Sequence, residues 1–143
     1  REAQPLVRYR TRDMVEIRGT GPCTCRRTGF RFRILGRSDD MVVVKGINVF
    51  PSGVAEVLNR LVPGVTGEFQ IFLDSLGPYD SLTIDVENGR QVRHGEMESL
   101  RRKIETTIRE ELTFTAHVRL VPPQTVPRTD MGKAPRIVKW YEA

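Results

Sequence analysis

Residues 36–51 constrain the fold of this chain more than any other stretch. Two adjacent carboxylates, at residues 39–40, come directly before the short apolar run of residues 41–44, which is typical of a buried strand. Gly46 interrupts this run, and a glycine inside a strand usually marks a bulge or a close approach of another backbone. Pro51 then begins a segment with the features of a helix start. The stretch therefore predicts a polar joint, a strand, a turn and a helix, in that order.

The segments that follow complete a pattern of strands and helices. The clearest helix is predicted over residues 97–112, where apolar residues recur at helical spacing through a highly charged segment. Residues 82–86 alternate apolar with polar side chains, as a half-buried strand does. The other predicted elements are a helix over residues 52–61 and strands over residues 68–74 and 116–121. The order β-α-β-β-α-β predicts an α+β domain of the split βαβ type over residues 40–121, with two helices on one face of an antiparallel or mixed sheet.

Residues 1–35 have the pattern of short strands but not of a complete domain. Residues 14–17 and 30–35 each alternate apolar with charged side chains. Two or three short strands bury little surface, and a lone hairpin is only marginally stable in water. The chain also begins without a methionine. We therefore expect a fragment or cleaved product of a longer protein, in which residues 1–39 end a larger domain and residues 40–143 form a second one.

The charge of the chain is unevenly distributed. The net charge is +5, yet residues 1–37 alone hold ten arginines against three acidic residues, a local balance of +7. Such a basic patch attracts phosphates, whether of a nucleotide or of a nucleic acid, and the charge alone does not distinguish these partners.

Composition also narrows the environment that we expect for the protein. No apolar run approaches the roughly 20 residues of a membrane span, and no basic-then-apolar leader is present. Cys23 and Cys25 are too few and too close together for a disulfide framework. With the distant His94 and His117 they also make a poor set of ligands for a tetrahedral zinc ion. We therefore expect a cytoplasmic protein with no metal site and no membrane partner.

Residues 36–51 resemble the hinge segment of the adenylate-forming acyl-CoA ligase superfamily. Within it, the Gly-Ile-Asn-Val-Phe-Pro wording of residues 46–51 is similar to the phenylacetate-CoA ligase family. In that superfamily the segment joins a large nucleotide-binding domain to a small mobile C-terminal domain. The resemblance implies that Asp39 is the pivot of the hinge. Without it, Asp39 would belong to a charged loop before an ordinary core strand.

The tail of the chain resembles a second motif of this superfamily, whose lysine serves the adenylation step. The match consists of Pro127, Arg128, Thr129, Gly132 and Lys133. When a carboxylate attacks the α-phosphate of ATP, negative charge gathers on the reacting oxygens, and a positioned ammonium group stabilises it. The resemblance therefore implies that Lys133 is catalytic. By its residue type alone, Lys133 would be a solvated loop lysine.

Residues 9–13 resemble a third motif, Tyr-x-Thr-x-Asp, whose aspartate hydrogen-bonds the ribose hydroxyls of the nucleotide. An ionised carboxylate such as Asp13 can accept hydrogen bonds from two hydroxyl groups. The commoner motif has glycine where this chain has Arg12, and arginine there is familiar in the phenylacetate branch. Arg37 is implied as a further ribose or phosphate contact. Alone, Asp13 would be a cap or turn residue, and Arg37 would form a weak surface ion pair with a neighbouring aspartate.

Lys45 and Gly46 are implied to face the site of thioester formation. A glycine there would leave room for the narrow pantetheine arm of coenzyme A. A plain β-bulge at Gly46 is the alternative interpretation.

The three motifs together imply an aryl-acid:CoA ligase similar to phenylacetate-CoA ligase, of which this chain is the C-terminal part. The whole enzyme would use ATP and Mg²⁺ to convert an aromatic carboxylic acid to an acyl-adenylate. CoA would then attack the adenylate to give acyl-CoA and AMP, after the small domain has rotated about the hinge. The expected partner is the missing N-terminal adenylation domain, which would hold the acid pocket. We therefore expect the chain alone to be inactive.

Two other functions fit parts of the sequence. An adenylation enzyme could pass the acyl group to a carrier protein, because carrier proteins present the same pantetheine thiol as CoA. An RNA-recognition motif has the same β-α-β-β-α-β outline, but it stacks bases on aromatic side chains of its central strands. Residues 82–86 contain no aromatic residue, and the basic excess lies outside the predicted sheet, so we expect no nucleic-acid partner.

Overall fold

The computed structural model describes residues 10–128 and 135–142, which fall into two compact units. The first unit ends at Asp39 and the second begins at Asp40. Within the described ranges, both α-helices belong to the second unit. Neither of them is long and apolar enough to cross a membrane.

The first unit is a β-hairpin, as the alternation of its residues predicted. Strands β1 (Asp13–Gly19) and β2 (Arg31–Arg37) pair antiparallel. Two strands cannot enclose a core, and the hairpin accordingly carries large apolar side chains on its surface. Those that are at least 40% exposed are Met14, Val15, Ile17, Phe30, Phe32 and Ile34. The described part of this unit therefore has no buried core of its own.

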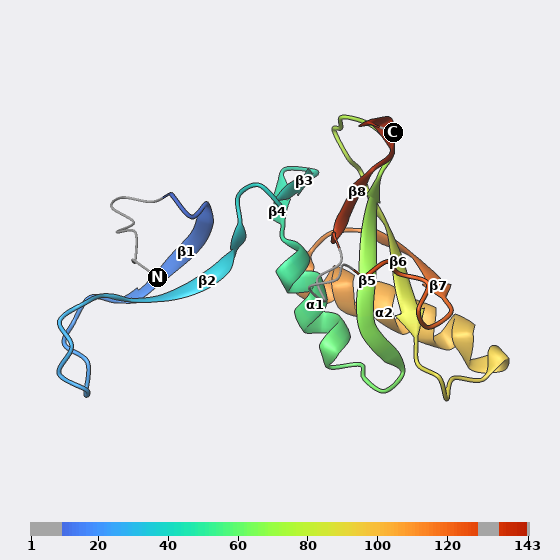
Figure 1. Cartoon of the computed structure of the whole chain (residues 1–143), viewed down its shortest axis with the longest axis horizontal. Coiled ribbons are helices and arrows are strands. Elements are labelled where there is room, and N and C mark those ends of the chain that lie inside the picture. Colours follow the sequence, from blue (N-terminus) through green and yellow to red (C-terminus); the bar gives the residue numbers. More distant parts are fainter. Residues whose placement is uncertain (1–9, 129–134, 143) are drawn as a thin grey trace, which may run out of the picture. The chain divides into compact units, whose positions relative to one another are not determined.

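The second unit contains a mixed four-stranded sheet (Figure 1). Its strands are β5 (Val65–Leu73), β6 (Leu82–Asn88), β7 (Ala116–Val121) and β8 (Ile137–Lys139). The sheet order is β7-β6-β5-β8, in which β5 pairs antiparallel with β6 and the two outer pairings are parallel. Two short 3₁₀ helices complete the unit, η1 (His94–Glu96) and η2 (Trp140–Glu142). The predicted α+β class with a mixed sheet is confirmed.

The strand expected over residues 41–44 does not enter this sheet. Strand β3 (Val42–Val44) instead pairs antiparallel with β4 (Ile47–Val49) in a separate hairpin. The chain turns back within two residues at Lys45 and Gly46, so β3 finds its partner locally. The split arrangement therefore does not form, because β6 and β7 are direct neighbours and β8 takes the edge position beside β5.

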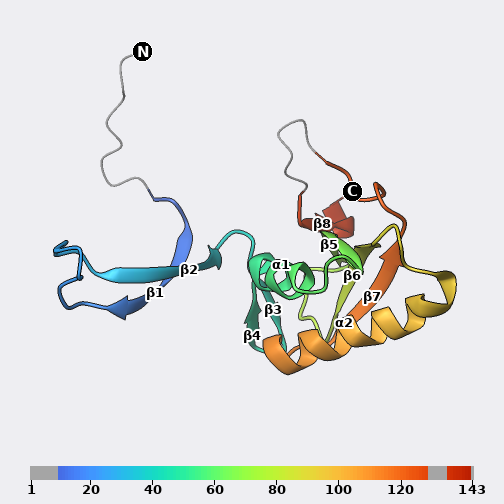
Figure 2. The same ribbon diagram turned by 90° about the horizontal axis from the view of Figure 1, so that it is seen from below.

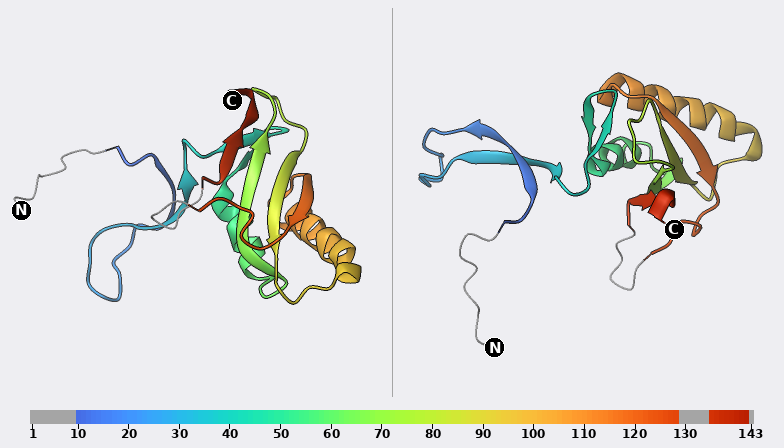
Figure 3. Two further views of the ribbon diagram at one scale, coloured as in Figure 1. Left: turned by 45° about the vertical axis from the view of Figure 1, so that its right-hand side comes forward. Right: turned by 90° about the horizontal axis from the view of Figure 1, so that it is seen from above.

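Helices α1 (Pro51–Asn59) and α2 (Met97–Leu112) have ends that local sequence explains. Pro51 occupies the first position of α1, where its missing N–H would have had no helical partner. After α2, Thr113 adopts a left-handed φ of 61° and its N–H bonds to the carbonyl of Arg109, which ends the helix. The left-hand view of Figure 3 looks onto the strands with both helices behind them. Figure 2 shows the same helices from below.

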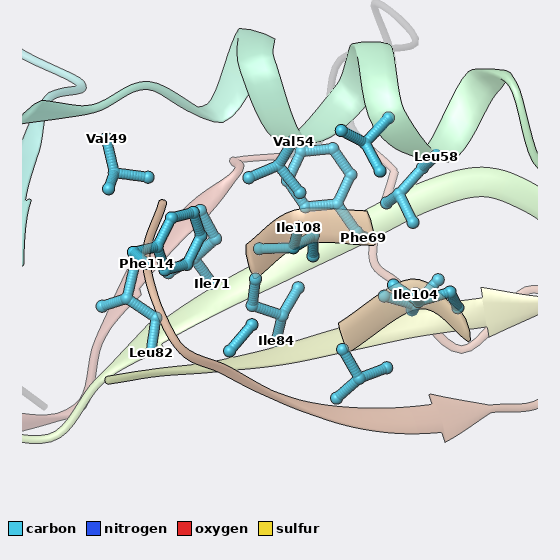
Figure 4. Packing of buried hydrophobic residues seen from close by; sticks show 14 of the residues in the cluster. Val49, Val54, Leu58, Phe69, Ile71, Leu82, Ile84, Ile104, Ile108 and Phe114 are labelled. Carbon is cyan, nitrogen blue, oxygen red and sulfur yellow. The ribbon is translucent and has the colours of Figure 1, made fainter. Parts of the chain in front are cut away.

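The hydrophobic core lies between the two helices and the sheet (Figure 4). Alternate positions of β5 and β6 point into it, and one face of each helix covers them. The central side chains are at most 1% exposed: Val54, Leu58, Phe69, Ile71, Leu82, Ile84, Ile104 and Ile108. Because each helix packs on the same sheet face and on the other helix, the two helices depend on one common core.

Shortening Leu58 tests this packing. Leu58 in α1 is fully buried, so Leu58→Ala should lower the free energy of unfolding by about 2–5 kcal/mol. The matched control is Leu76→Ala, since Leu76 is 84% exposed and its change should stay within about 0.5 kcal/mol. Urea unfolding followed by circular dichroism measures both, and equal effects of the two substitutions would contradict this description of the core.

Candidate functional site

The hairpin of the first unit brings Asp13 and Arg37 together. Asp13 is the first residue of β1 and lies opposite Arg37, the last residue of β2, in the strand register. The N–H of Ser38 donates to the carbonyl of Arg12 at 2.8 Å and extends the pairing beyond the strands. Two residues that are 24 positions apart in the chain, both expected to contact a nucleotide, therefore lie side by side.

Asp39 is held by arginines. Arg37 donates from Nε to Oδ1 at 3.0 Å and from Nη2 to Oδ2 at 2.8 Å, and Arg12 Nη1 lies 3.5 Å from Oδ2. The two bonds from Arg37 have the bidentate geometry that suits a carboxylate. The hydrogen bonds from Arg37, more than the charge of Arg12, hold the pKa of Asp39 below its ordinary value of 3.8. The ion pair that residue type alone suggested for Arg37 is therefore present, and its partner is Asp39, the last residue of the first unit.

Arg12 has an unusual backbone conformation. Its φ is 65°, in the left-handed region that glycine adopts without steric cost. This is the position at which the commoner form of the nucleotide motif has glycine. The backbone at residue 12 therefore has a conformation that glycine would adopt readily, while the arginine side chain adds a second positive charge near Asp39.

Lys45 and Gly46 are the two central residues of the turn between β3 and β4. Both have a positive φ, 48° and 80°, as the favoured two-residue hairpin turns require. Gly46 is therefore a turn residue, and the interpretation as a β-bulge was wrong. A Cβ placed on Gly46 would meet no atom of the described chain within 4 Å, so the turn presents open backbone.

The turn is fixed from the segment before β6. The N–H of Lys45 donates to the carbonyl of Tyr79 at 3.0 Å, and Lys45 Nζ lies 3.8 Å from Oδ1 of Asp80. Burial, more than the nearby Tyr141 and Asp74, raises the pKa of the Tyr79 phenol. Beside Tyr79 is an open pocket of about 160 Å³, lined by Phe72, Asp74, Tyr79, Ser81, Thr83, Arg119 and Trp140. That volume is well below the ~300 Å³ at which small-molecule sites begin, so this pocket does not hold a nucleotide by itself.

Lys133, the residue expected to be catalytic, lies outside the described residues. The residues on either side of its segment are described and are bonded to the sheet. Arg128 Nη2 donates to Oε2 of Glu87 at 3.2 Å, and the N–H of Val126 donates to Oε1 at 2.9 Å. On the other side, Arg136 Nη1 donates to Glu68 Oε2 at 2.8 Å. Glu87, which the alternation of β6 had placed on a polar face, is fully buried.

The cysteines do not join a larger set of ligands. Cys23 and Cys25 are both free thiols, and hydrogen bonds from Cys25 lower the pKa of Cys23. Among the residues that the structure describes, no group of three His, Cys, Asp or Glu side chains is placed to hold a metal ion.

Removing Arg37 tests the electrostatics at Asp39. Arg37→Gln should raise the pKa of Asp39 toward 3.8, because the hydrogen bonds that favour its ionised form are lost. Since the folded-state pKa lies below the unfolded value, the ion pair contributes to stability above pH 3.8 and is lost as pH falls through the lower, folded value. Carboxyl-carbon NMR titration of Asp39 measures the pKa. Arg12→Gln is the matched control and should shift it less; a larger shift from Arg12→Gln would reverse our ranking of the two arginines.

Known proteins resemble this chain over most of its length. A phenylacetate-coenzyme A ligase of Aromatoleum evansii is 34% identical over 142 residues, which are 96% of this chain and 31% of the relative. A 2-hydroxyisobutyryl-CoA ligase, solved in the postadenylation state with R3-HIB-AMP, matches with a TM-score of 0.78 and 29% identity over 92% of this chain and 28% of that chain. The same ligase with 2-HIB-AMP and CoA, in the thioesterification state, matches with a TM-score of 0.62 and 29% identity over 90% of this chain and 27% of that chain.

These relatives confirm the predicted resemblance to the phenylacetate-CoA ligase family. This chain spans about a third of the length of the curated relatives that it matches. The sequence pattern of one family, described as the AMP-binding enzyme C-terminal domain, matches residues 46–139, which include both α-helices and the whole sheet. The chain therefore belongs to the AMP-binding enzyme C-terminal domain family.

Proposed function

We propose that this chain is the C-terminal part of an ATP-dependent aryl-acid:CoA ligase. The whole enzyme would join an aromatic carboxylic acid to AMP, with release of pyrophosphate, and then transfer the acyl group to the thiol of CoA. The main support is the similarity of nearly the whole chain to a phenylacetate-coenzyme A ligase. The CoA ligases among the similar structures favour CoA over a carrier protein as the acceptor.

Adenylation would depend on charge brought to the reacting phosphate. As the carboxylate oxygen bonds to the α-phosphorus, the bond to the leaving pyrophosphate breaks and negative charge spreads over the phosphoryl oxygens. The Lys133 ammonium would stabilise that charge and orient the two anions. Mg²⁺ would arrive with ATP and partly neutralise its phosphates. The adenine, phosphate and acid pockets would belong to the N-terminal adenylation domain.

Asp13 and Arg37 would bind the nucleotide from the first unit. The carboxylate of Asp13 would accept hydrogen bonds from the ribose hydroxyls, and Arg37 would donate to a ribose or phosphate oxygen. Their neighbouring positions across β1 and β2 support a shared ligand. Arg37 already donates to Asp39, so contact with a nucleotide would share or replace these bonds.

Asp39 would be the pivot about which residues 40–143 rotate between the two half-reactions. The division of the chain into compact units directly after this residue supports the proposal. The exposure of the ion pair between Arg37 and Asp39 also supports the proposal, because exposed ion pairs contribute little stability and would oppose rotation only weakly.

The Lys45–Gly46 turn would face the site of thioester formation after this rotation. Its open backbone at Gly46 would admit the pantetheine arm. Lys45 holds the left-handed conformation that the turn requires, at the cost that any residue with a Cβ atom has there. Asparagine or glycine would satisfy the turn at lower cost, so the presence of lysine at this position supports a role for its side chain.

Substitution of Lys133 tests the adenylation role. In the full-length ligase, Lys133→Ala should lower ATP–pyrophosphate exchange by about 10²- to 10³-fold, as loss of a transition-state donor does. Thioester formation from a supplied acyl-adenylate should change much less, because that step begins after the carboxylate has attacked the α-phosphate and pyrophosphate has left. Lys103→Ala, on an exposed position of α2, is the control and should retain both activities. Equal loss of both half-reactions in Lys133→Ala would reject the assigned role.

Substitution of Lys45 separates function from stability. Asparagine tolerates the left-handed conformation better than lysine, so Lys45→Asn should raise the free energy of unfolding by up to about 1 kcal/mol. In the full-length ligase the same change should slow thioester formation from supplied adenylate and spare adenylation. Asp80→Asn, which leaves the lysine but removes the carboxylate 3.8 Å from Nζ, should keep both half-reactions. Normal thioester formation in Lys45→Asn would show that the lysine has no part in that step.

A further inference from the structure

A fully buried carboxylate, Glu87, lies on the sheet face opposite the helices. It projects from β6 on the side away from Val86, which points into the core. Its oxygens accept three hydrogen bonds: from Thr66 Oγ1 at 3.1 Å, from the N–H of Val126 at 2.9 Å and from Arg128 Nη2 at 3.2 Å. Burying a charge is costly unless it is paired and hydrogen-bonded, and these three donors satisfy that requirement.

Two of those donors belong to the segment that leads to Lys133. In the left-hand view of Figure 3, the orange-red segment after β7 crosses the strands on the face away from the helices. Val126 is 4% exposed although it belongs to no part of the helix-side core. The Arg128 side chain is 45% exposed, and its contact with Glu87 reaches a side chain that is 0% exposed.

A second set of bonds holds the segment where it returns to the sheet. Gln70 Nε2 donates to the carbonyl of Pro135 at 3.1 Å, and the N–H of Ile71 donates to the carbonyl of Arg136 at 2.8 Å. The Arg136 guanidinium also lies 4.6 Å from the ring centre of Phe69. Lys133 is five residues from Arg128 and three from Arg136.

We propose that Glu87 is a positioning residue for adenylation, which acts by fixing through Arg128 the segment that carries Lys133. This inference rests on the proposed catalytic role of Lys133. The bond from Arg128 to Glu87 attaches the chain to the sheet before residues 129–134, and the bonds at Arg136 attach it after them. Glu87 touches no reacting atom, so its effect on the reaction passes through the lysine.

The chemistry of the donors identifies a selective substitution. In Glu87→Gln, one amide oxygen can still accept from Val126, and the Thr66 hydroxyl can accept from the new amide instead of donating. The Arg128 guanidinium can only donate, so it loses its partner. Glu87→Gln therefore releases Arg128 while keeping the shape of the buried side chain. Arg128→Gln breaks the same contact from its exposed end and leaves the buried glutamate with two neutral donors.

The test compares both half-reactions in the full-length ligase. Glu87→Gln and Arg128→Gln should each lower ATP–pyrophosphate exchange about ten- to a hundredfold, which is the factor that the free energy of one hydrogen bond to a charged group corresponds to. Thioester formation from supplied acyl-adenylate should stay within about twofold of the unmodified ligase. The matched control is Glu111→Gln, which breaks the Arg60–Glu111 pair that joins the two helices. It should leave both half-reactions unchanged. Loss of both half-reactions in proportion to the unfolded fraction, in both test variants, would overturn the proposal and leave Glu87 as a structural residue.

A double substitution shows whether Glu87 acts through the lysine. If it does, Glu87→Gln should reduce the residual exchange of Lys133→Ala by less than twofold, since the positioned group is already absent. A further tenfold loss would overturn the proposal. If Lys133→Ala alone leaves ATP–pyrophosphate exchange intact, the proposed role of Lys133 is rejected. If Lys133→Ala lowers exchange but Glu87→Gln does not, only the proposed role of Glu87 is rejected.

Hydrogen exchange measured by mass spectrometry adds a readout that does not depend on activity. The peptide that contains residues 122–136 should exchange faster in Glu87→Gln than in the unmodified ligase, with peptides of α1 and α2 unchanged. Unchanged exchange in residues 122–136 would overturn the proposal, because the segment would then not depend on Glu87.

Discussion

Burial of the central strands on both faces is the constraint on which the rest of the second unit depends. Strands β5 and β6 pack against α1 and α2 on one face, where a cluster of buried apolar side chains forms the core. Their other face carries Gln70 and Glu87, which are 6% and 0% exposed. Polar groups buried so deeply need partners, and apart from Thr66 the partners given above come from the end of the chain. The position of the tail is therefore specified by hydrogen bonds, whereas the positions of the helices are specified by apolar packing.

The two carboxylates that arginines hold differ in their surroundings. Asp39 stays partly exposed at the end of the first unit, where water screens its attraction to Arg37. Glu87 is fully buried, so the loss of any of its donors leaves a charge that water cannot reach. In the proposed mechanism this difference is useful. A pivot requires contacts that break at low cost, while a segment that carries a catalytic lysine requires a firm attachment to the sheet.

The accuracy of the predictions from sequence followed the length and regularity of each element. The predicted bounds of the long helix and of the strand at residues 116–121 agree with α2 and β7, because their apolar spacing extends over the whole element. Strands β4 and β8 have three residues each, too few to establish a period, and both were missed. The expected split sheet was wrong because the turn at Lys45 and Gly46 gives β3 a local partner. Among the site residues, motif matches selected Asp13, Arg37 and Asp39, but nothing in their spacing showed that Asp13 would lie opposite Arg37.

Patterns within the chain specified the longer elements, the family and the residues to which its chemistry can be assigned, because side-chain periodicity and short motifs are local properties. Contacts between distant segments specified the strand order, the pairing of β3 with β4 and the burial of Glu87. The alternation of β6 correctly assigned Glu87 to the face away from the helices, but no local pattern shows that another part of the chain covers that face. The burial of Glu87 depends on where residues 122–128 pack, and these residues lie about 40 positions from Glu87 in the chain. Contacts over that distance are decided by the tertiary structure, in which every buried polar group needs a hydrogen-bond partner.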